Sequence, residues 1–259
     1  MTAASAIASA HIREEPYVNV SFSLQGQHLP ADHGYLLYSA ISRVTGYRTA
    51  SGSDRVGAGS AGVPPARSPL HKTDWLAIEL ISGFPSGPGL ITLPDRNATL
   101  RLRIPAGHYR DVLSLAGKRL AIGGHQIRLG LPVARPLEPA PSLYARVVTI
   151  KKFTESDPFI EAVKRKLDSF GVKARVELPR DEHGRYRRRI VTIHGKSVVG
   201  FSVAVHDLND GDSLLLQGGA VKVVSPGDGA TQWQSIFSRR AMGCGIFNPI
   251  VRNIPTDEQ

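Results

Sequence analysis

The spacing of apolar and polar residues predicts a regular order of strands and helices in the first half of the chain. Residues 17–24 alternate apolar and polar side chains, as a strand with one buried face does. Apolar residues then recur at helical spacing over 30–43, with Asp32 as the expected N-cap. The other predicted elements of this half are strands at 75–81 and 99–104, a short helix at 105–115 and a hairpin at 119–131 that turns at Gly123 and Gly124. This β-α-β-β-α-β order is that of a ferredoxin-like unit.

The second half repeats the same order. Its predicted elements are strands at 143–150, 172–178, 190–205 and 242–247, and helices at 157–170 and 208–217. Gly171 follows the first of these helices and is expected to end it. The pattern therefore predicts an α+β protein made of two tandem ferredoxin-like (βαββαβ) domains.

Composition shifts along the chain give the expected domain boundaries. A Pro-rich stretch at 134–142 separates the two repeats and is the natural linker. The predicted organisation is a flexible lead-in at 1–16, an N-terminal domain at 17–135 with a Gly/Ser/Pro-rich insertion at 46–69, and a C-terminal domain at 143–250 with a basic hairpin at 180–189 and a second insertion at 218–237.

The positive charge of the chain indicates that the protein binds a polyanion. Among 259 residues, Lys and Arg number 32 and Asp and Glu 22, a formal net charge of +10. Basic residues exceed acidic ones in both halves, so the charge is a property of both predicted domains. The single cysteine, Cys244, excludes an intrachain disulfide and fits a reducing compartment. No apolar run is long enough to span a membrane, so we expect a cytoplasmic protein without a membrane partner.

The densest basic segment is the predicted hairpin at 180–189. A basic hairpin can lie in a nucleic-acid groove, whereas the alternative is a solvated loop whose arginines only keep the protein soluble. The net charge favours the first interpretation. The residues that we expect to bind RNA in and around the second domain are Lys151, Lys152, Arg185, Arg187, Arg188, Arg189 and Lys196.

A second basic segment, SRRAMGCGIFNP, lies near residue 243. Arg239 and Arg240 precede Gly243 and Gly245, and glycine lets a backbone approach a phosphate closely. The alternative is a tight turn before an edge strand. The chain has no P-loop, zinc-protease or nucleophile-elbow motif and no tight cluster of histidines and carboxylates, so we expect neither a cofactor nor a metal.

These features together resemble a known family, the CRISPR-associated repeat-processing endoribonucleases, of the Myxococcus-type or transposon-associated variety. The matching segments follow one another along nearly the whole chain: LPADHGYLLYSAISR, LHKTDWLAIELISG, LRLRIP, LAGKRLAIGGHQIRLGLP, RVVTIKKFTESDPF, GKSVVGFSV, DGDSLLLQ and SRRAMGCGIF. The resemblance implies tandem ferredoxin-like domains, metal-independent cleavage of precursor CRISPR RNA within its repeats, and retention of the mature RNA. It also implies partnership with other subunits of a CRISPR effector complex.

The resemblance also implies candidate catalytic residues. His71 falls where the family carries a catalytic histidine after the first helix, and Lys72 beside it is suited to the charge on the phosphate. His33 at the start of the first helix matches the family, with a structural role as its alternative. Ser42 stands where relatives carry a hydroxyl or aromatic group that orients the ribose. Glu79 departs from the pattern, because relatives usually have a histidine in that element.

Two functions follow from this reading. The first is an endoribonuclease in which the RNA 2′-hydroxyl attacks the adjacent phosphorus and leaves a 2′,3′-cyclic phosphate, with histidine moving the protons. The second is a catalytically inactive subunit that binds the repeat hairpin in an effector complex. Cleavage of repeat RNA in the presence of EDTA separates the two.

Overall fold

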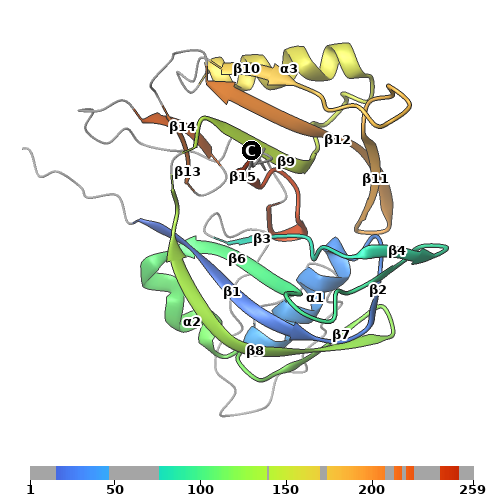
Figure 1. The fold of residues 1–259 in the computed structure, drawn as a ribbon, viewed down its shortest axis with the longest axis vertical. Helices are drawn as coiled ribbons and strands as arrows, with labels where there is room; N and C mark the ends of the chain where they lie inside the picture. The colour runs from blue at the N-terminus through green and yellow to red at the C-terminus, as the bar shows by residue number, and fades with distance from the viewer. Residues whose placement is uncertain are drawn as a thin grey trace, which may run out of the picture.

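The computed structural model describes residues 16–46, 76–138, 140–169, 174–207, 213–217, 220–224 and 240–250. The lead-in before Pro16 and the insertion after Gly46 lie outside these residues, as do the candidate residues His71, Lys72 and Arg239. The described part is α+β, with two tandem ferredoxin-like units (Figure 1).

A five-stranded antiparallel sheet with the order β3-β6-β1-β8-β7 forms the N-terminal unit. Its elements are β1 (Tyr17–Gln25), α1 (Gly34–Thr45), β3 (Ala77–Ile78), β6 (Thr99–Pro105), the 3-10 helix η2 (Ala106–His108), α2 (Tyr109–Leu113), β7 (Arg119–Ile122) and β8 (His125–Pro136). Strand β1 lies between β6 and β8, as the first strand of a ferredoxin-like unit lies between the third and the fourth. Apolar residues of α1 and α2 pack on one face of this sheet, and within the described residues no helix covers its other face (Figure 1).

A small sheet next to α1 was not predicted from the sequence pattern. It consists of β2 (His28–Pro30), β5 (Leu90–Thr92) and β4 (Phe84–Gly87), in the order β2-β5-β4. Proline and glycine in β4 obscure the alternation that identifies a strand, so pairing with β5 decides its structure.

The C-terminal unit has the sheet order β10-β12-β9-β15, and β11 pairs with the first part of β12. Its elements are β9 (Ser142–Val148), α3 (Ser156–Asp168), β10 (Ala174–Glu177), β11 (Arg188–Ile193), β12 (Lys196–Asp207), β13 (Ser213–Gln217), β14 (Ala220–Val224), the 3-10 helix η3 (Arg240–Met242) and β15 (Phe247–Pro249). Helix α3 buries Phe159 against the sheet, where its ring centroid lies 4.8 Å from that of Phe201.

Three predictions for this unit were wrong in detail. The helix expected at 208–217 is in its described part the strand β13, which pairs with β14, a strand within the second predicted insertion. A short apolar run does not distinguish strand from helix, and the partner strand decides. The strand expected at 190–205 is the hairpin β11–β12, which turns at His194 and Gly195, both with positive φ. The last strand, expected at 242–247, begins only at Phe247.

The two units share an apolar interface. The core cluster of the N-terminal unit includes five residues from the second half of the chain: Val147, Ile193, Ala241, Met242 and Cys244. Strand β15 and the residues before it thus run between the two sheets, with β15 paired to β9 (Figure 1). The segment 241–247 is buried throughout.

Candidate nucleic-acid interface

His33 is buried at the junction between the two units. Its side chain is 1% exposed, and its Nδ1 lies 2.8 Å from the carbonyl oxygen of Pro30. A carbonyl only accepts, so Nδ1 carries the proton, and Nε2 accepts the backbone N–H of Ile81 at 3.0 Å. Burial lowers the pKa of His33, and the positive charge of Arg146 lowers it further. His33 is therefore a neutral imidazole with both ring nitrogens already bonded.

The start of α1 differs from the prediction in its N-cap. His33 occupies the N-cap position and makes no side-chain capping bond. Asp32, the expected cap, instead accepts the backbone N–H of Thr192 through Oδ2 at 2.7 Å. This bond ties the end of the β11–β12 hairpin to the beginning of α1.

Ser42 faces the core rather than the solvent. Its side chain is fully buried, and its hydroxyl has no hydrogen-bond partner among the described residues. Contact between Ser42 and a ribose would therefore require an opening of the packing around α1.

The outward face of α1 presents other polar side chains that the sequence analysis missed. Tyr35, Ser39 and Arg43 follow one another at intervals of four residues and line a pocket of about 330 Å³. The turn of the β7–β8 hairpin, at Gly123 and Gly124, forms the opposite wall. Helical spacing counted from the buried residues could have identified this face.

His194 is a second missed residue. It lies exposed in the β11–β12 turn with φ of 49°, and its ring centroid is 5.0 Å from that of Tyr35 in an edge-on arrangement. Only the docking of the hairpin on α1 brings these two residues together, so no local sequence signal could have indicated it.

The basic loop before β11 is held by its own hydrogen bonds. Asp181 accepts the backbone N–H groups of His183 and Arg185 through Oδ1, which lowers its pKa. The guanidinium of Arg180 lies 4.1 Å from the ring centroid of Tyr186 and donates to its hydroxyl. Arg187 donates through Nε to the carbonyl oxygen of Arg180 at 3.2 Å. This loop is therefore ordered, rather than a loosely solvated tip.

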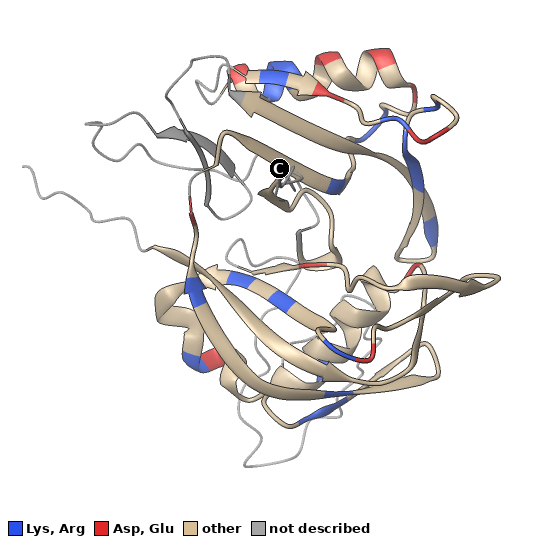
Figure 2. Cartoon of the chain, in the orientation of Figure 1, with Lys and Arg blue, Asp and Glu red and all other residues tan. Residues whose placement is uncertain are grey.

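The predicted RNA-binding cations do not form a single patch. Lys151 and Lys152 follow β9 at the end of the sheet where β11 begins with Arg188, since Val148 and Arg188 both pair with Phe201. Lys196 lies at the other end of β11, roughly 17 Å away along the strand. All of them are exposed, as are Arg185, Arg187 and Arg189. The arginines of β11 lie on an edge strand of the C-terminal sheet, where Figure 2 shows blue segments along β11.

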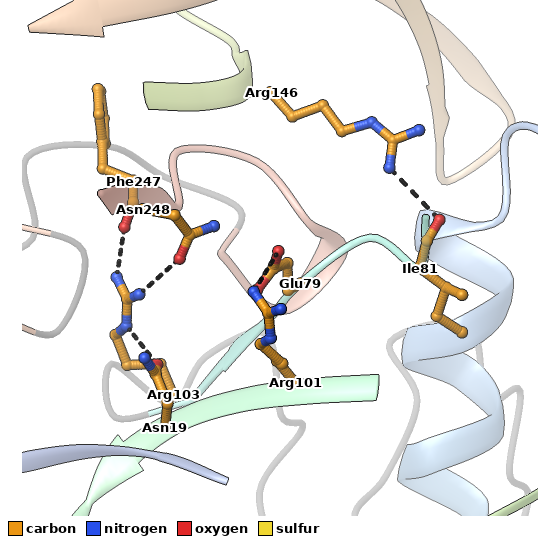
Figure 3. Close-up of polar contacts among 8 residues, drawn as sticks. All are labelled: Asn19, Glu79, Ile81, Arg101, Arg103, Arg146, Phe247 and Asn248. Carbon is orange, nitrogen blue, oxygen red and sulfur yellow. Dashed lines mark hydrogen bonds and ion pairs between the residues drawn. The ribbon is translucent and has the colours of Figure 1, made fainter. Parts of the chain in front are cut away.

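Arg146 extends the positive charge into the junction. Burial lowers its pKa, and the like charge of Arg189 lowers it further. Its Nη1 donates to the carbonyl oxygen of Ile81 at 3.3 Å (Figure 3). The N–H of the same residue donates to His33, so Arg146 and His33 bond the two backbone groups of Ile81.

The glycine-rich segment is buried in the interface between the units. Gly243 has φ of 82°, and a Cβ there would lie 2.5 Å from the side chain of Leu80. Gly245 has φ of 68° and donates its N–H to the carbonyl oxygen of Val147 at 2.7 Å. Packing against Leu80 explains Gly243 and the positive φ explains Gly245, and their expected contact with RNA stays a prediction. Arg240 lies in η3 just before them.

Two further features of the described residues concern other classes of site. They contain no group of three or more His, Cys, Asp or Glu side chains placed to hold a metal ion. Within the same residues, no helix combines the length and apolarity needed to cross a bilayer.

The family model for Cas6, described as "Cas6 Crispr", matches residues 18–252. The chain belongs to the Cas6 family. It is 34% identical over 233 residues to the CRISPR-associated endonuclease Cas6 of Myxococcus xanthus (strain DK1622), which covers 90% of this chain and 81% of that protein.

Solved Cas6 structures share the fold. One, described as a Cas6-related protein from Pyrococcus furiosus, has a TM-score of 0.52 and 12% identity, covering 91% of this chain and 99% of that one. Another, described as CRISPR-associated protein Cas6, has a TM-score of 0.50 and 13% identity, covering 91% and 100%. This agreement confirms the two tandem ferredoxin-like units.

Proposed function

We propose that this Cas6-family chain is an endoribonuclease that binds CRISPR repeat RNA and cuts its precursor to give mature CRISPR RNA. The observation that carries the proposal is the family match over residues 18–252, together with a relative named as an endonuclease. The row of exposed arginines on β11 and in the loop before it supports an RNA substrate, because such cations neutralise phosphates.

The proposed reaction uses the RNA's own 2′-hydroxyl as the nucleophile. A base removes its proton, the oxygen attacks the adjacent phosphorus, and an acid protonates the departing 5′-oxygen. The products are a 2′,3′-cyclic phosphate and a 5′-hydroxyl, and no metal takes part. We assign the base or acid role to His71 and stabilisation of the phosphorane charge to Lys72.

Other residues take supporting roles in this proposal. His33 and Ser42 remain candidates, but in the described conformation both ring nitrogens of His33 are bonded and the Ser42 hydroxyl is buried. We therefore rank His71 first. The arginines on β11 and in the preceding loop bind the repeat, and the enzyme stays on the hairpin it has cut, as a subunit of an effector complex.

The test is single-turnover cleavage of the repeat RNA in EDTA. His71→Ala is expected to slow cleavage by about 10² to 10⁴-fold, the usual contribution of a general acid or base, while hairpin affinity changes by only a few-fold. His33→Ala is the matched comparison. Normal cleavage by His71→Ala together with loss in His33→Ala would move the catalytic role to His33, and loss of wild-type activity in EDTA would overturn the metal-free mechanism.

One observation favours a second function. The one candidate histidine in the described residues, His33, is held in the core, and Glu79 stands where the family resemblance leads us to expect a histidine. A subunit that binds the repeat without cutting it would have these features. Tight binding of repeat RNA without any cyclic-phosphate product would select this function.

A further inference from the structure

The helix-free face of the N-terminal sheet forms one wall of a groove between the two units. The groove has a volume of about 680 Å³, within the usual range of ligand sites, and β15 forms its other side. Asn19, Ser21 and Ser23 of β1 point into it, because side chains alternate along a strand and the residues between them face the core. The groove therefore presents amide and hydroxyl groups from β1, and the exposed apolar side chains of Leu131 and Val133 on β8 line it beside them.

Three arginines line the groove, and two of them are exposed to solvent. Arg103 is 3% exposed and donates to Asn19, to the carbonyl oxygen of Phe247 and to Asn248, at 2.9–3.0 Å (Figure 3). Arg101 and Arg135 are exposed and line the groove. The register places Arg101 beside Ser21 and Arg135 beside Asn19, so each cation has a neutral polar neighbour on β1.

Arg101 has a weak internal counter-ion in Glu79. Its Nη1 lies 3.5 Å from both carboxylate oxygens of Glu79, longer than the 2.7–2.9 Å of a strong charged hydrogen bond. The two side chains are 47% and 26% exposed, a setting in which ion pairs contribute little. The backbone N–H of Glu79 donates to the carbonyl oxygen of Arg101 at 2.9 Å, so the carboxylate stays beside the guanidinium even when the pair opens.

A second cation adds to the charge around Glu79. Its carboxylate also interacts electrostatically with Arg146, whose guanidinium is bonded to the carbonyl oxygen of Ile81 rather than to a carboxylate (Figure 3). Glu79 thus interacts with two guanidinium groups, and the exposed Glu138 is the carboxylate among the residues that line the groove, which include three arginines. An incoming phosphodiester brings the negative charge that this arrangement lacks.

We propose that the groove binds a single-stranded RNA segment through Arg101 and Arg135, and that Glu79 is the internal counter-ion that an RNA phosphate displaces from Arg101. Hydroxyl and amide groups of β1 suit the ribose, and guanidinium groups suit the phosphates. No exposed aromatic ring lines the groove, so contact with the backbone rather than base stacking accounts for binding. Because Glu79 competes with the RNA phosphate for Arg101, it weakens RNA binding and keeps the exchange of bound RNA in the groove fast. This inference rests on the proposed function, since that function supplies the RNA.

The test measures binding of a short, fluorescein-labelled single-stranded RNA without a hairpin, by anisotropy over a range of KCl concentrations. Glu79→Gln is expected to tighten RNA binding by about two- to fivefold, because the exposed ion pair between Glu79 and Arg101 no longer competes with the RNA phosphate. Arg101→Gln is expected to weaken binding and to reduce the slope of log K against log salt by about 0.7. In the Arg101→Gln background, Glu79→Gln should have a clearly smaller effect, since the two changes act on one contact.

Glu161→Gln is the matched control. It removes a carboxylate that pairs with Lys164 on α3 at 2.9 Å, away from the groove, and changes the net charge equally. Equal tightening by Glu161→Gln and Glu79→Gln would overturn the counter-ion role. Competition by a polyglutamate peptide as strong as that by RNA would overturn the choice of ligand.

Cleavage of the repeat RNA by the same variants separates this inference from the proposed function. If wild type cuts the repeat but Arg101→Gln binds the single strand as wild type does, only the groove assignment is wrong. If wild type binds neither RNA, the proposed function and the groove assignment are both wrong.

Discussion

At the scale of single residues, His33 links the sequence of α1 to the position of the loop that follows β3. Its imidazole joins the carbonyl oxygen of Pro30 to the N–H of Ile81, two backbone groups that would otherwise be buried without these partners. A charged imidazole carries protons on both nitrogens and could not accept the N–H of Ile81. Asp32 raises and Arg146 lowers its pKa, but burial is the largest effect and lowers it.

The stability of the protein should therefore fall in mild acid. The unfolded state takes up a proton near pH 6.5, and folded His33 does so only at lower pH, so the free energy of unfolding decreases as pH drops below 6.5. Urea titrations between pH 7.5 and 5.5 should show this decrease, up to about 1.4 kcal/mol per pH unit. His33→Gln should remove much of it, whereas His183→Gln, at an exposed position, should not. An identical pH dependence in wild type and His33→Gln would contradict the assignment.

At the scale of elements, the loop before β11 combines structure and charge. Arg180 and Arg187 bond within the loop, whereas Arg188 and Arg189 stand exposed on β11, paired across from Phe201 and Gly200. The loop thus positions the strand arginines at the edge of the sheet. An RNA backbone along this edge would meet them in sequence.

Replacing Arg187, Arg188 and Arg189 together by Gln should weaken repeat binding. Each lost phosphate contact should reduce the slope of log K against log salt by about 0.7 to 0.9. The cleavage rate at saturating protein should stay nearly constant, because we propose that these residues bind the RNA and do not transfer protons. Arg110→Gln on α2, at the far side of the N-terminal unit, serves as the control (Figure 1). An unchanged salt slope in the triple variant would show that this edge does not bind RNA.

How far the sequence could predict these elements depended on whether their partners were local. Strand β1, helix α1 and the β7–β8 hairpin follow from alternation, helical spacing and a Gly-Gly turn, all readable within a few residues. Strand β13 could not be distinguished from a helix, because its apolar run takes its conformation from β14.

The residues of the candidate site likewise divide into those that local sequence spacing predicts and those that depend on distant parts of the chain. Tyr35 and Arg43 lie on a face that helical spacing defines. His33 bonds Ile81, and Asp32 bonds Thr192. Gly243 packs against Leu80. Each of these pairs joins distant parts of the chain. Sequence spacing carries no information about such pairs.

At the scale of the whole molecule, Arg103 connects the two units. Its guanidinium reaches from β6 to Phe247 and Asn248 on β15 and also bonds Asn19 of its own sheet. The charge is buried, so its hydrogen bonds rather than solvent must satisfy it. The groove between the two units lies beside these hydrogen bonds of Arg103.

Arg103→Met should loosen β15 without unfolding the N-terminal sheet. The carbonyl oxygen of Phe247 would lose a charged donor, at a cost of about 1–3 kcal/mol in the free energy of unfolding. Hydrogen exchange of the amides in β15 should accelerate more than that in β1. Arg135→Met, on the same face but exposed, should leave both the stability and the exchange of β15 close to wild type. Unaltered protection of β15 in Arg103→Met would show that strand pairing with β9 alone holds the units together.

The placement of residues 241–244 in the core of the N-terminal unit also bears on how the protein matures in the cell. A ribosome makes Val20, Leu37 and Leu102 long before Met242 and Cys244, yet all five belong to the same apolar cluster. The first unit emerges with part of its core uncovered beside Gly34, where a Cβ atom would lie 2.6 Å from the carbonyl oxygen of Met242 in the finished fold. Its final packing must wait until translation has passed residue 244, so the junction forms after both sheets have been synthesised. An RNA that needs both units thus meets a competent protein only after the residues up to Cys244 have left the ribosome.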